Sequence, residues 1–217
     1  MSDLILGVDT STRVAVGAAD GERVLASRLA GDTRSHVERL AETIAQVLGD
    51  AGASLSDVAR IGVGVGPGPF TGLRVGIATA VVLGEALRVP VTGVCGLDVV
   101  ALQQPPGRQF VAIADARRHE VYWARYDRSG LRAAGPFVGP PSRLPDLPVM
   151  GPGLEIYPDL APGTAPAPID AGFLAANLHR LPDVGLEPLY LRQPDADSPS
   201  TRKSAIMGRR VAIGGRP

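Results

Sequence analysis

The sequence predicts an α/β protein built from two related lobes, of which the second is reduced. A buried strand followed by a hairpin begins at Leu4, and a similar strand and hairpin begin at Phe110. A Pro-Pro-Gly run at residues 105–107 separates the two starts and is typical of a boundary. We therefore expect an N-terminal lobe over residues 1–103 and a shorter C-terminal lobe over residues 108–193.

Short patterns predict the elements of the first lobe. Residues 4–8 are apolar like a buried strand, and Asp20-Gly21 is a strong hairpin signal between two alternating segments. Ser35 and Glu38 form a capping-box pattern, and apolar residues follow at helical spacing as far as Leu48. The other elements predicted for this lobe are strands at 61–65 and 91–94 and helices at 72–88 and 97–102.

The second half of the chain is less regular. Residues 110–115 and 120–126 predict a second pair of strands. Proline becomes dense beyond Gly135, which favours irregular structure with a strand at 147–150 and a helix at 171–180. Residues 195–217 are rich in Ser, Pro, Arg and Gly, and we expect this tail to be disordered.

Composition restricts the class of protein. The chain has 217 residues, 45% of them apolar, and a formal net charge of zero, so no strong field favours nucleic acid or a membrane surface. No signal peptide is visible, and a single cysteine, Cys95, fits a reducing compartment. The sequence therefore predicts a cytoplasmic globular protein in which Cys95 is a small core residue.

The Gly/Pro-rich loop after residue 63 leaves two interpretations open. Its glycines could bring backbone N–H groups close to a phosphate at a helix N-terminus, or they could form a rigid turn for tight packing. A Walker A loop needs a lysine, but the one lysine is the distant Lys203, and the glycine spacing does not match a dinucleotide fingerprint. The candidate nucleotide-proximal residues are Asp9, Thr10, Ser11, Gly66 and Gly68.

In each lobe, one aspartate follows the first predicted strand. Asp9 could hold a cation through water, but we favour a turn in which Asp9 and Thr10 accept hydrogen bonds from the backbone that follows. Asp115 opens the second lobe in the same way, as a partner across a cleft or as a turn residue. No metal site is predicted, because His36, His119 and His179 are scattered and fit surface positions. Peptidase motifs are also absent from the sequence.

The helix at 72–88 is apolar on all sides. It carries no charge between Arg74 and Glu85, and Gly76, Ala80 and Gly84 recur every four residues. Such a helix must be covered all round, and we expected it to be too short to span a bilayer. We therefore predict a protein–protein interface, with a fully intramolecular core as the alternative. The predicted interface residues are Val37, Leu40, Ile44, Leu73, Gly76, Ile77, Ala80 and Gly84.

Four motifs in this order resemble the TsaB family. They are Asp-Thr-Ser at 9–11, Gly-Pro-Gly-Pro-Phe-Thr-Gly-Leu-Arg at 66–74, Asp-Ala-Arg at 115–117 and Glu-Pro-Leu-Tyr-Leu-Arg at 187–192. The resemblance covers roughly residues 3 to 193, and the segment at 66–74 is highly specific, although Pro69 replaces the usual Ser. It implies the actin/Hsp70-like ATPase (ASKHA) fold, with two duplicated lobes and a reduced second lobe.

The resemblance also implies a function. TsaB proteins are non-catalytic subunits that pair with and activate a TsaD-like catalytic subunit in making threonylcarbamoyladenosine (t6A) in tRNA, with a TsaE-like ATPase. The resemblance further implies a homodimer when the chain is alone, tRNA reached only through the complex, no membrane contact, and ATP and Mg²⁺ used by the complex with no cofactor held tightly here. The TsaD His-x-x-x-His metal motif has no counterpart at residues 89–102.

Two alternatives remain. The chain could be an autonomous actin-fold phosphotransferase of the sugar-kinase kind, against which the missing phosphate-binding lysine and the short second lobe argue. The basic tail could bind tRNA directly, but its arginines lack the interleaved aromatic residues that such binding favours.

Overall fold

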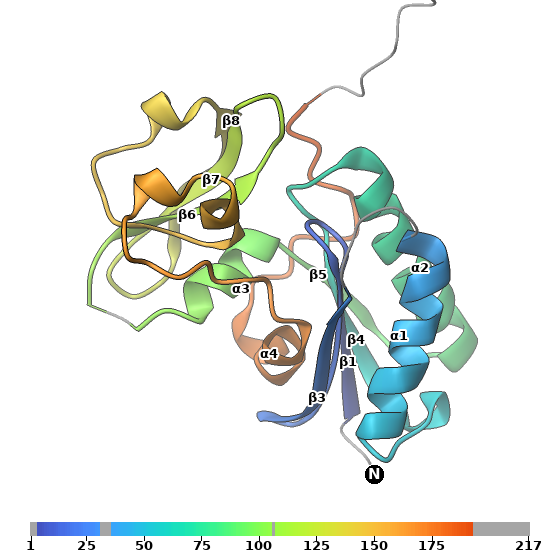
Figure 1. Cartoon of the computed structure of the whole chain (residues 1–217). Helices are drawn as coiled ribbons and strands as arrows, with labels where there is room; N and C mark the ends of the chain where they lie inside the picture. Colours follow the sequence, from blue (N-terminus) through green and yellow to red (C-terminus); the bar gives the residue numbers. More distant parts are fainter. Residues whose placement is uncertain (1–3, 31–35, 106, 193–217) are drawn as a thin grey trace, which may run out of the picture.

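Two β-sheets with the same strand order form the frame of the molecule (Figure 1). The computed structural model describes residues 4–30, 36–105 and 107–192. The first sheet has the order β3-β2-β1-β4-β5, with β1–β2 and β2–β3 antiparallel and β1–β4 and β4–β5 parallel. Its strands are β1 (Leu4–Asp9), β2 (Val14–Asp20), β3 (Arg23–Ala30), β4 (Val58–Gly64) and β5 (Val91–Val94).

The second sheet repeats this pattern without a fifth strand. Its order is β8-β7-β6-β9, again antiparallel, antiparallel and parallel. The strands are β6 (Phe110–Asp115), β7 (Val121–Tyr126), β8 (Arg132–Gly139) and β9 (Val149–Met150). The second hairpin therefore builds its own sheet, which confirms the predicted duplication and the reduced second copy.

Helices cover the first sheet on both faces (Figure 1). Helices α1 (His36–Asp50) and α2 (Phe70–Leu87) lie on one face, where they share a core with β1, β2 and β4. Helix α4 (Ala171–Ala176) contacts β1, β2 and β3 on the other face. Short 3-10 turns make up much of the remainder: η1 (Leu55–Asp57), η2 (Pro141–Arg143), η3 (Pro152–Glu155), η4 (Pro158–Leu160) and η5 (Leu178–Arg180).

Helix α4 corrects the expected division of the chain. It belongs to the 108–193 segment in sequence, yet it packs directly on the backbone of the first sheet. A Cβ atom added to Gly17 would lie 2.1 Å from the backbone nitrogen of Gly172, and one added to Gly7 would lie 2.1 Å from the carbonyl oxygen of Ala171. Only glycine permits such an approach. Residues 108–193 therefore do not keep to one lobe, because their last part completes the first.

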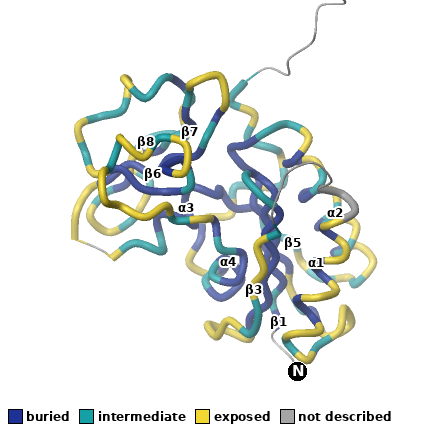
Figure 2. The backbone as a smooth tube through the Cα atoms, in the orientation of Figure 1, coloured by how far each residue is buried: buried dark blue, intermediate teal, exposed yellow. Residues whose placement is uncertain are grey.

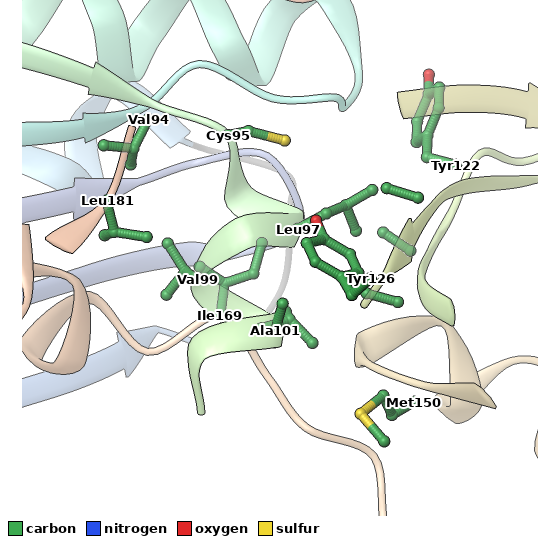
Figure 3. Close-up of a cluster of buried hydrophobic side chains, with 14 of the residues drawn as sticks. Val94, Cys95, Leu97, Val99, Ala101, Tyr122, Tyr126, Met150, Ile169 and Leu181 are labelled. Atoms are coloured by element: carbon green, nitrogen blue, oxygen red, sulfur yellow. The ribbon is translucent and has the colours of Figure 1, made fainter. Parts of the chain in front are cut away.

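The core between the lobes is organised around α3 (Gly96–Leu102). Its residues Leu97, Val99 and Ala101 lie between side chains of the first lobe and the second sheet (Figure 3). On the same helix, the buried Asp98 accepts a hydrogen bond of 2.8 Å from the Tyr126 hydroxyl and pairs with Arg132 at 3.1 Å. A continuous interior therefore joins the two lobes.

Several predicted elements need correction. Strand β8 lies where proline density predicted irregular structure, and the predicted helix at 171–180 divides into α4 and η5. The length argument against a membrane span was also wrong. Helix α2 has 18 residues and a mean hydropathy of 1.5, so length and composition alone would allow it to cross a bilayer; the core helix of a soluble protein has the same properties. The capping-box side chains and the tail at 195–217 lie outside the described residues.

Candidate functional site: the cleft between the lobes

Two adjoining cavities lie where the lobes meet. They have volumes of about 230 Å³ and about 170 Å³ and share Pro69, Asp115 and Arg117 in their walls. The larger is lined further by the Gly/Pro loop, the β6–β7 hairpin and residues 190–192. The smaller is lined by residues 11–13 and by residues near η3. Ligand sites for small molecules usually measure about 300–1,000 Å³, so each cavity is small for a nucleoside triphosphate.

The end of β1 is packed under the first turns of α2. Asp9, Thr10 and Ser11 are all buried. The Ser11 backbone N–H and hydroxyl donate to Asp9 Oδ1 at 2.9 Å and 2.7 Å, as the turn interpretation predicted. Thr10 differs from that prediction, because its hydroxyl donates to the Gly72 carbonyl at 2.8 Å.

The second carboxylate oxygen of Asp9 is unusual. Oδ2 is buried and has no hydrogen-bond partner among the described residues. A Cβ atom on Gly64 would lie 1.8 Å from Oδ2, so the carboxylate rests directly on the β4 backbone. Burial raises the pKa of Asp9 to about 6, against the opposing effect of the Ser11 hydrogen bonds. This carboxylate is costly to bury in its charged form.

The glycines of the loop serve close packing. A Cβ atom on Gly68 would lie 2.8 Å from the Ser11 carbonyl oxygen, and one on Gly66 would lie 3.0 Å from Leu73 Cδ1. The structure thus packs Ser11 against Asp9 and Gly68, whereas Thr10 contacts Gly72 and Gly66 contacts Leu73. Of these, Ser11 lines the smaller cavity and Gly68 the larger. The packing interpretation of the loop accounts for these contacts, and a nucleotide contact stays a prediction.

The β6–β7 hairpin loop lies opposite the Gly/Pro loop. Asp115 Oδ1 accepts a hydrogen bond of 3.0 Å from the Arg117 backbone N–H, in a turn like that of Asp9. Arg117, Arg118 and His119 all have positive φ angles, of 58°, 53° and 59°. Non-glycine residues adopt this conformation at a cost, and such strain is concentrated at functional sites. The sequence analysis identified Asp115 here but not this run of left-handed residues.

Residues 190–192, at the end of the Glu-Pro-Leu-Tyr-Leu-Arg motif, line the larger cavity. The Tyr190 ring stacks on Phe70 with centroids 4.5 Å apart, and its hydroxyl accepts a hydrogen bond of 3.1 Å from Arg74 Nε. Arg192 forms an ion pair with Glu120 of the hairpin loop. The sequence analysis noted this motif only as part of the family resemblance, because nothing local in it indicates contacts with two distant loops.

The residues predicted for a partner interface lie in the core instead. The side chains of Leu40, Ile44, Leu73, Ile77 and Ala80 are buried within the first lobe. A Cβ on Gly84 would lie 2.3 Å from the Val91 side chain, and Gly76 packs on Thr10. These residues cannot form an exposed docking face. The Val37 side chain lies outside the described residues.

A different face of α2 is exposed and apolar. Val82 is 65% exposed, and Figure 2 shows the outer sides of α1 and α2 open to solvent. We call the solvent-facing stripe the outer face of α2. It comprises Thr71, Val75, Ala78, Thr79, Val82 and Ala86, which are exposed or half-buried, recur at helical spacing and carry no charge.

The remaining candidate residues are Cys95 and the three histidines. Cys95 is fully buried, and burial raises the pKa of its thiol to about 12, so it stays protonated. His119 and His179 are exposed, whereas the His36 side chain lies outside the described residues. Within the described ranges, no cluster of three or more His, Cys, Asp or Glu side chains could hold a metal.

Comparison with known proteins agrees with this geometry. A family model described as TsaD, tRNA N6-adenosine threonylcarbamoyltransferase, matches residues 24–169. An uncharacterized protein of Mycobacterium leprae is 42% identical over 207 residues, covering 89% of this chain and 56% of that protein. The TsaB protein of Escherichia coli, named as a tRNA threonylcarbamoyladenosine biosynthesis protein, is 33% identical over 127 residues, or 57% of this chain and 55% of its own length. The chain thus spans about half the length of these two relatives.

A solved structure extends the likeness. YeaZ from Pseudomonas aeruginosa has 30% sequence identity and a TM-score of 0.65, covering 88% of this chain and 100% of that one. The duplicated sheets and the cleft between them define a two-lobed protein with the actin/Hsp70-like ATPase fold. Within that class, the chain belongs to the threonylcarbamoyltransferase family that the model describes, as a member of its TsaB (YeaZ) branch.

Proposed function

We propose that this chain is a non-catalytic dimerisation and activating subunit of the complex that makes t6A in tRNA. The complex would transfer a threonylcarbamoyl group to the adenosine beside the anticodon, and a TsaD-like partner would catalyse this reaction. Membership of the TsaB branch carries the proposal. A TsaE-like ATPase would use ATP and Mg²⁺, tRNA would be reached through the complex, and the chain would bind no cofactor tightly.

The outer face of α2 is the proposed docking surface. It is an uncharged stripe of small and medium side chains on an 18-residue helix, and its central residue, Val82, is largely exposed. Contiguous apolar surface on a soluble protein favours a partner. Small side chains such as Ala78 and Ala86 let another helix approach closely. In the lone chain, the same face would pair with a second copy, giving a cytoplasmic homodimer.

The phosphotransferase alternative has less support. The two cavities of the cleft are small, and the wall formed by residues 190–192 occupies part of the space between the lobes. The buried end of β1 contacts the loop glycines directly. No observation in the described residues favours this alternative over the first proposal.

Val82→Arg tests the docking surface. An arginine at this exposed position should leave folding intact but bury an unpaired charge in any helix–helix contact. We expect the variant to be monomeric by light scattering and unable to support t6A formation with its cognate catalytic subunit. Ser142→Arg, at an exposed position on the second lobe, is the matched control and should behave as wild type. Association and full activity of Val82→Arg would refute the proposal.

Substitutions at the interface residues predicted from the sequence would not test the docking surface. Ala80 is fully buried and Gly84 contacts Val91, so an arginine at either position would disrupt the core of the lobe. Loss of association would then reflect unfolding.

A further inference from the structure

Residues 187–192 cross from one lobe to the other at the mouth of the cleft. The segment is drawn in red near the end of the described chain in Figure 1, where it runs between the lobes. It is fixed to the first sheet where the Leu189 backbone N–H donates to the Val65 carbonyl at 2.8 Å. The Leu189 side chain packs against both the core of the first lobe and the core between the lobes.

The next residue of the segment is clamped to α2. Two side chains contact Phe70: Tyr190 stacks on its ring, and the Arg74 guanidinium lies 3.7 Å from its centroid. Arg74 also donates to the Tyr190 hydroxyl, which closes a three-residue cluster on the first turns of α2. Stacked aromatic pairs and cation–π contacts are both stabilising beyond the area that they bury.

The end of the segment reaches the second lobe. Arg192 pairs with Glu120, which follows the three left-handed residues of the β6–β7 loop. On the other side of the cleft, Arg13 and Glu155 form a second ion pair between the lobes. An isolated exposed ion pair stabilises little, but Arg192 is held in place by the stacked Tyr190 two residues before it.

We propose that residues 187–192 are a latch that fixes the relative placement of the two lobes and ties it to the first turns of α2. The segment has one anchor on α2 and on Val65, directly after β4, and one on the β6–β7 loop. The lobes cannot separate at this edge unless the Tyr190 stack or the Arg192–Glu120 pair is broken. The latch also encloses the larger cavity, so its release would open the cleft.

Spin-label distance measurements between the lobes test the latch. Cysteines replacing the exposed Ala45 on α1 and Ser142 on η2 provide the labelling sites, since the buried Cys95 thiol should not react. The labelled chain is diluted with an excess of unlabelled chain, so that only distances within one chain are measured. We then expect a narrow distance distribution for the wild type. Tyr190→Ala and Arg192→Glu should each broaden it and shift it to longer distances. Glu187→Ala, an exposed position in the same segment, is the matched control and should leave the distribution unchanged.

Charge reversal gives the decisive comparison. The double variant Arg192→Glu with Glu120→Arg restores an opposite-charge pair and should narrow the distribution again. Hydrogen exchange should also become faster in residues 70–76 in Tyr190→Ala. The Arg192 variants change only partly exposed side chains, so they carry the test even if Tyr190→Ala unfolds. Unchanged distributions in the Arg192→Glu variant, or a double variant as broad as the single one, would overturn the latch.

Discussion

The two sheets share the order of four strands, but a helix covers one face of the first sheet and 3-10 turns cover the equivalent face of the second. The two sheets can be aligned by matching the pair Asp9↔Ala15 in the first with Asp115↔Val121 in the second. In this alignment, the pair Gly7↔Gly17 of the first sheet corresponds to Ile113↔Trp123 of the second. Helix α4 rests on the glycine pair of the first sheet. The equivalent face of the second sheet carries large side chains, which pack with Leu154 and residues around η4.

This difference shows how a duplicated lobe can lose a helix. Where the strand residues are small, a helix must supply the buried surface by approaching the backbone. Where they are large, the strand residues fill the space, and a loop of short 3-10 turns is enough to cover them. The reduced second lobe therefore keeps its own outer core without a helix on that face.

The largest effect is expected from adding a side chain at the glycine pair on which α4 packs. Gly17→Val would place side-chain atoms where the Gly172 backbone now lies, so α4 would have to leave the sheet. We expect a loss of more than about 4 kcal/mol in the free energy of unfolding, measured by urea denaturation, or no folded protein. Gly49→Ala is the control, because nothing lies within 4 Å of its added Cβ. A stable Gly17→Val variant would show that α4 is not essential to the first sheet.

The second sheet should respond to removal of bulk instead. Ile113 is fully buried in the outer core, and Ile113→Ala should cost about 3 kcal/mol through the cavity it leaves. Leu131→Ala, at a position 63% exposed, should change stability by less than about 0.5 kcal/mol in the same urea titration. A similarly small effect at Ile113 would mean that the 3-10 turns do not form a real cover.

Asp9, at the end of β1, should make the stability of the protein depend on pH. The native pKa of Asp9 is about 6, above its ordinary value of 3.8, so the folded chain binds more protons than the unfolded chain between these values. The stabilisation present near pH 4 should be lost as pH rises through about 6, a change of about 2 to 3 kcal/mol. Asp9→Asn should remove this part of the pH dependence, measured by urea denaturation at several pH values.

A second variant checks the cause. Ser11→Ala removes a hydrogen bond that lowers the Asp9 pKa, so the pH at which stability falls should move upward. A midpoint that moves downward, or a wild-type slope retained in Asp9→Asn, would contradict the assignment to Asp9.

The smallest effect is expected in the hairpin loop of the second lobe. His119 is exposed and has a φ of 59°, a conformation that glycine adopts without strain. His119→Gly should raise the free energy of unfolding by at most about 1 kcal/mol. Relief of backbone strain stabilises the folded chain, but the greater entropy of the unfolded glycine variant offsets part of this gain. Lower stability in thermal denaturation would show that the loop needs the imidazole.

Local signals predicted the elements with strong turn chemistry. Asp20-Gly21 predicted the first hairpin, and the strand-like segments at 110–115 and 120–126 predicted the second. Strand β8 was missed because it contains Gly135 and Pro136, where Gly135 has a φ of 99° and the pairing register shifts nearby. Its strand character comes from pairing with β7, which no local pattern reveals.

The sequence was least informative about which neighbours each helix face and each loop contacts. Apolar periodicity found α2, but its small-residue stripe was taken for a partner surface when it packs on Thr10 and Val91. Small residues indicate close approach without naming the neighbour. Asp9 and its turn were recognised at the cleft, whereas the contacts of Tyr190 and Arg192 depend on loops distant in sequence.

The placement of α4 has a consequence for how the chain folds as it is synthesised. Ser27 on β3 donates a hydrogen bond to Asp170 across 143 positions of sequence. A growing chain therefore exposes the face of β1, β2 and β3 that α4 covers until the chain has been made as far as α4, more than 140 residues after β3. Such long-range closure slows folding and leaves strands unprotected in the meantime. The first sheet is thus covered on this face only after the strands of both sheets have been made.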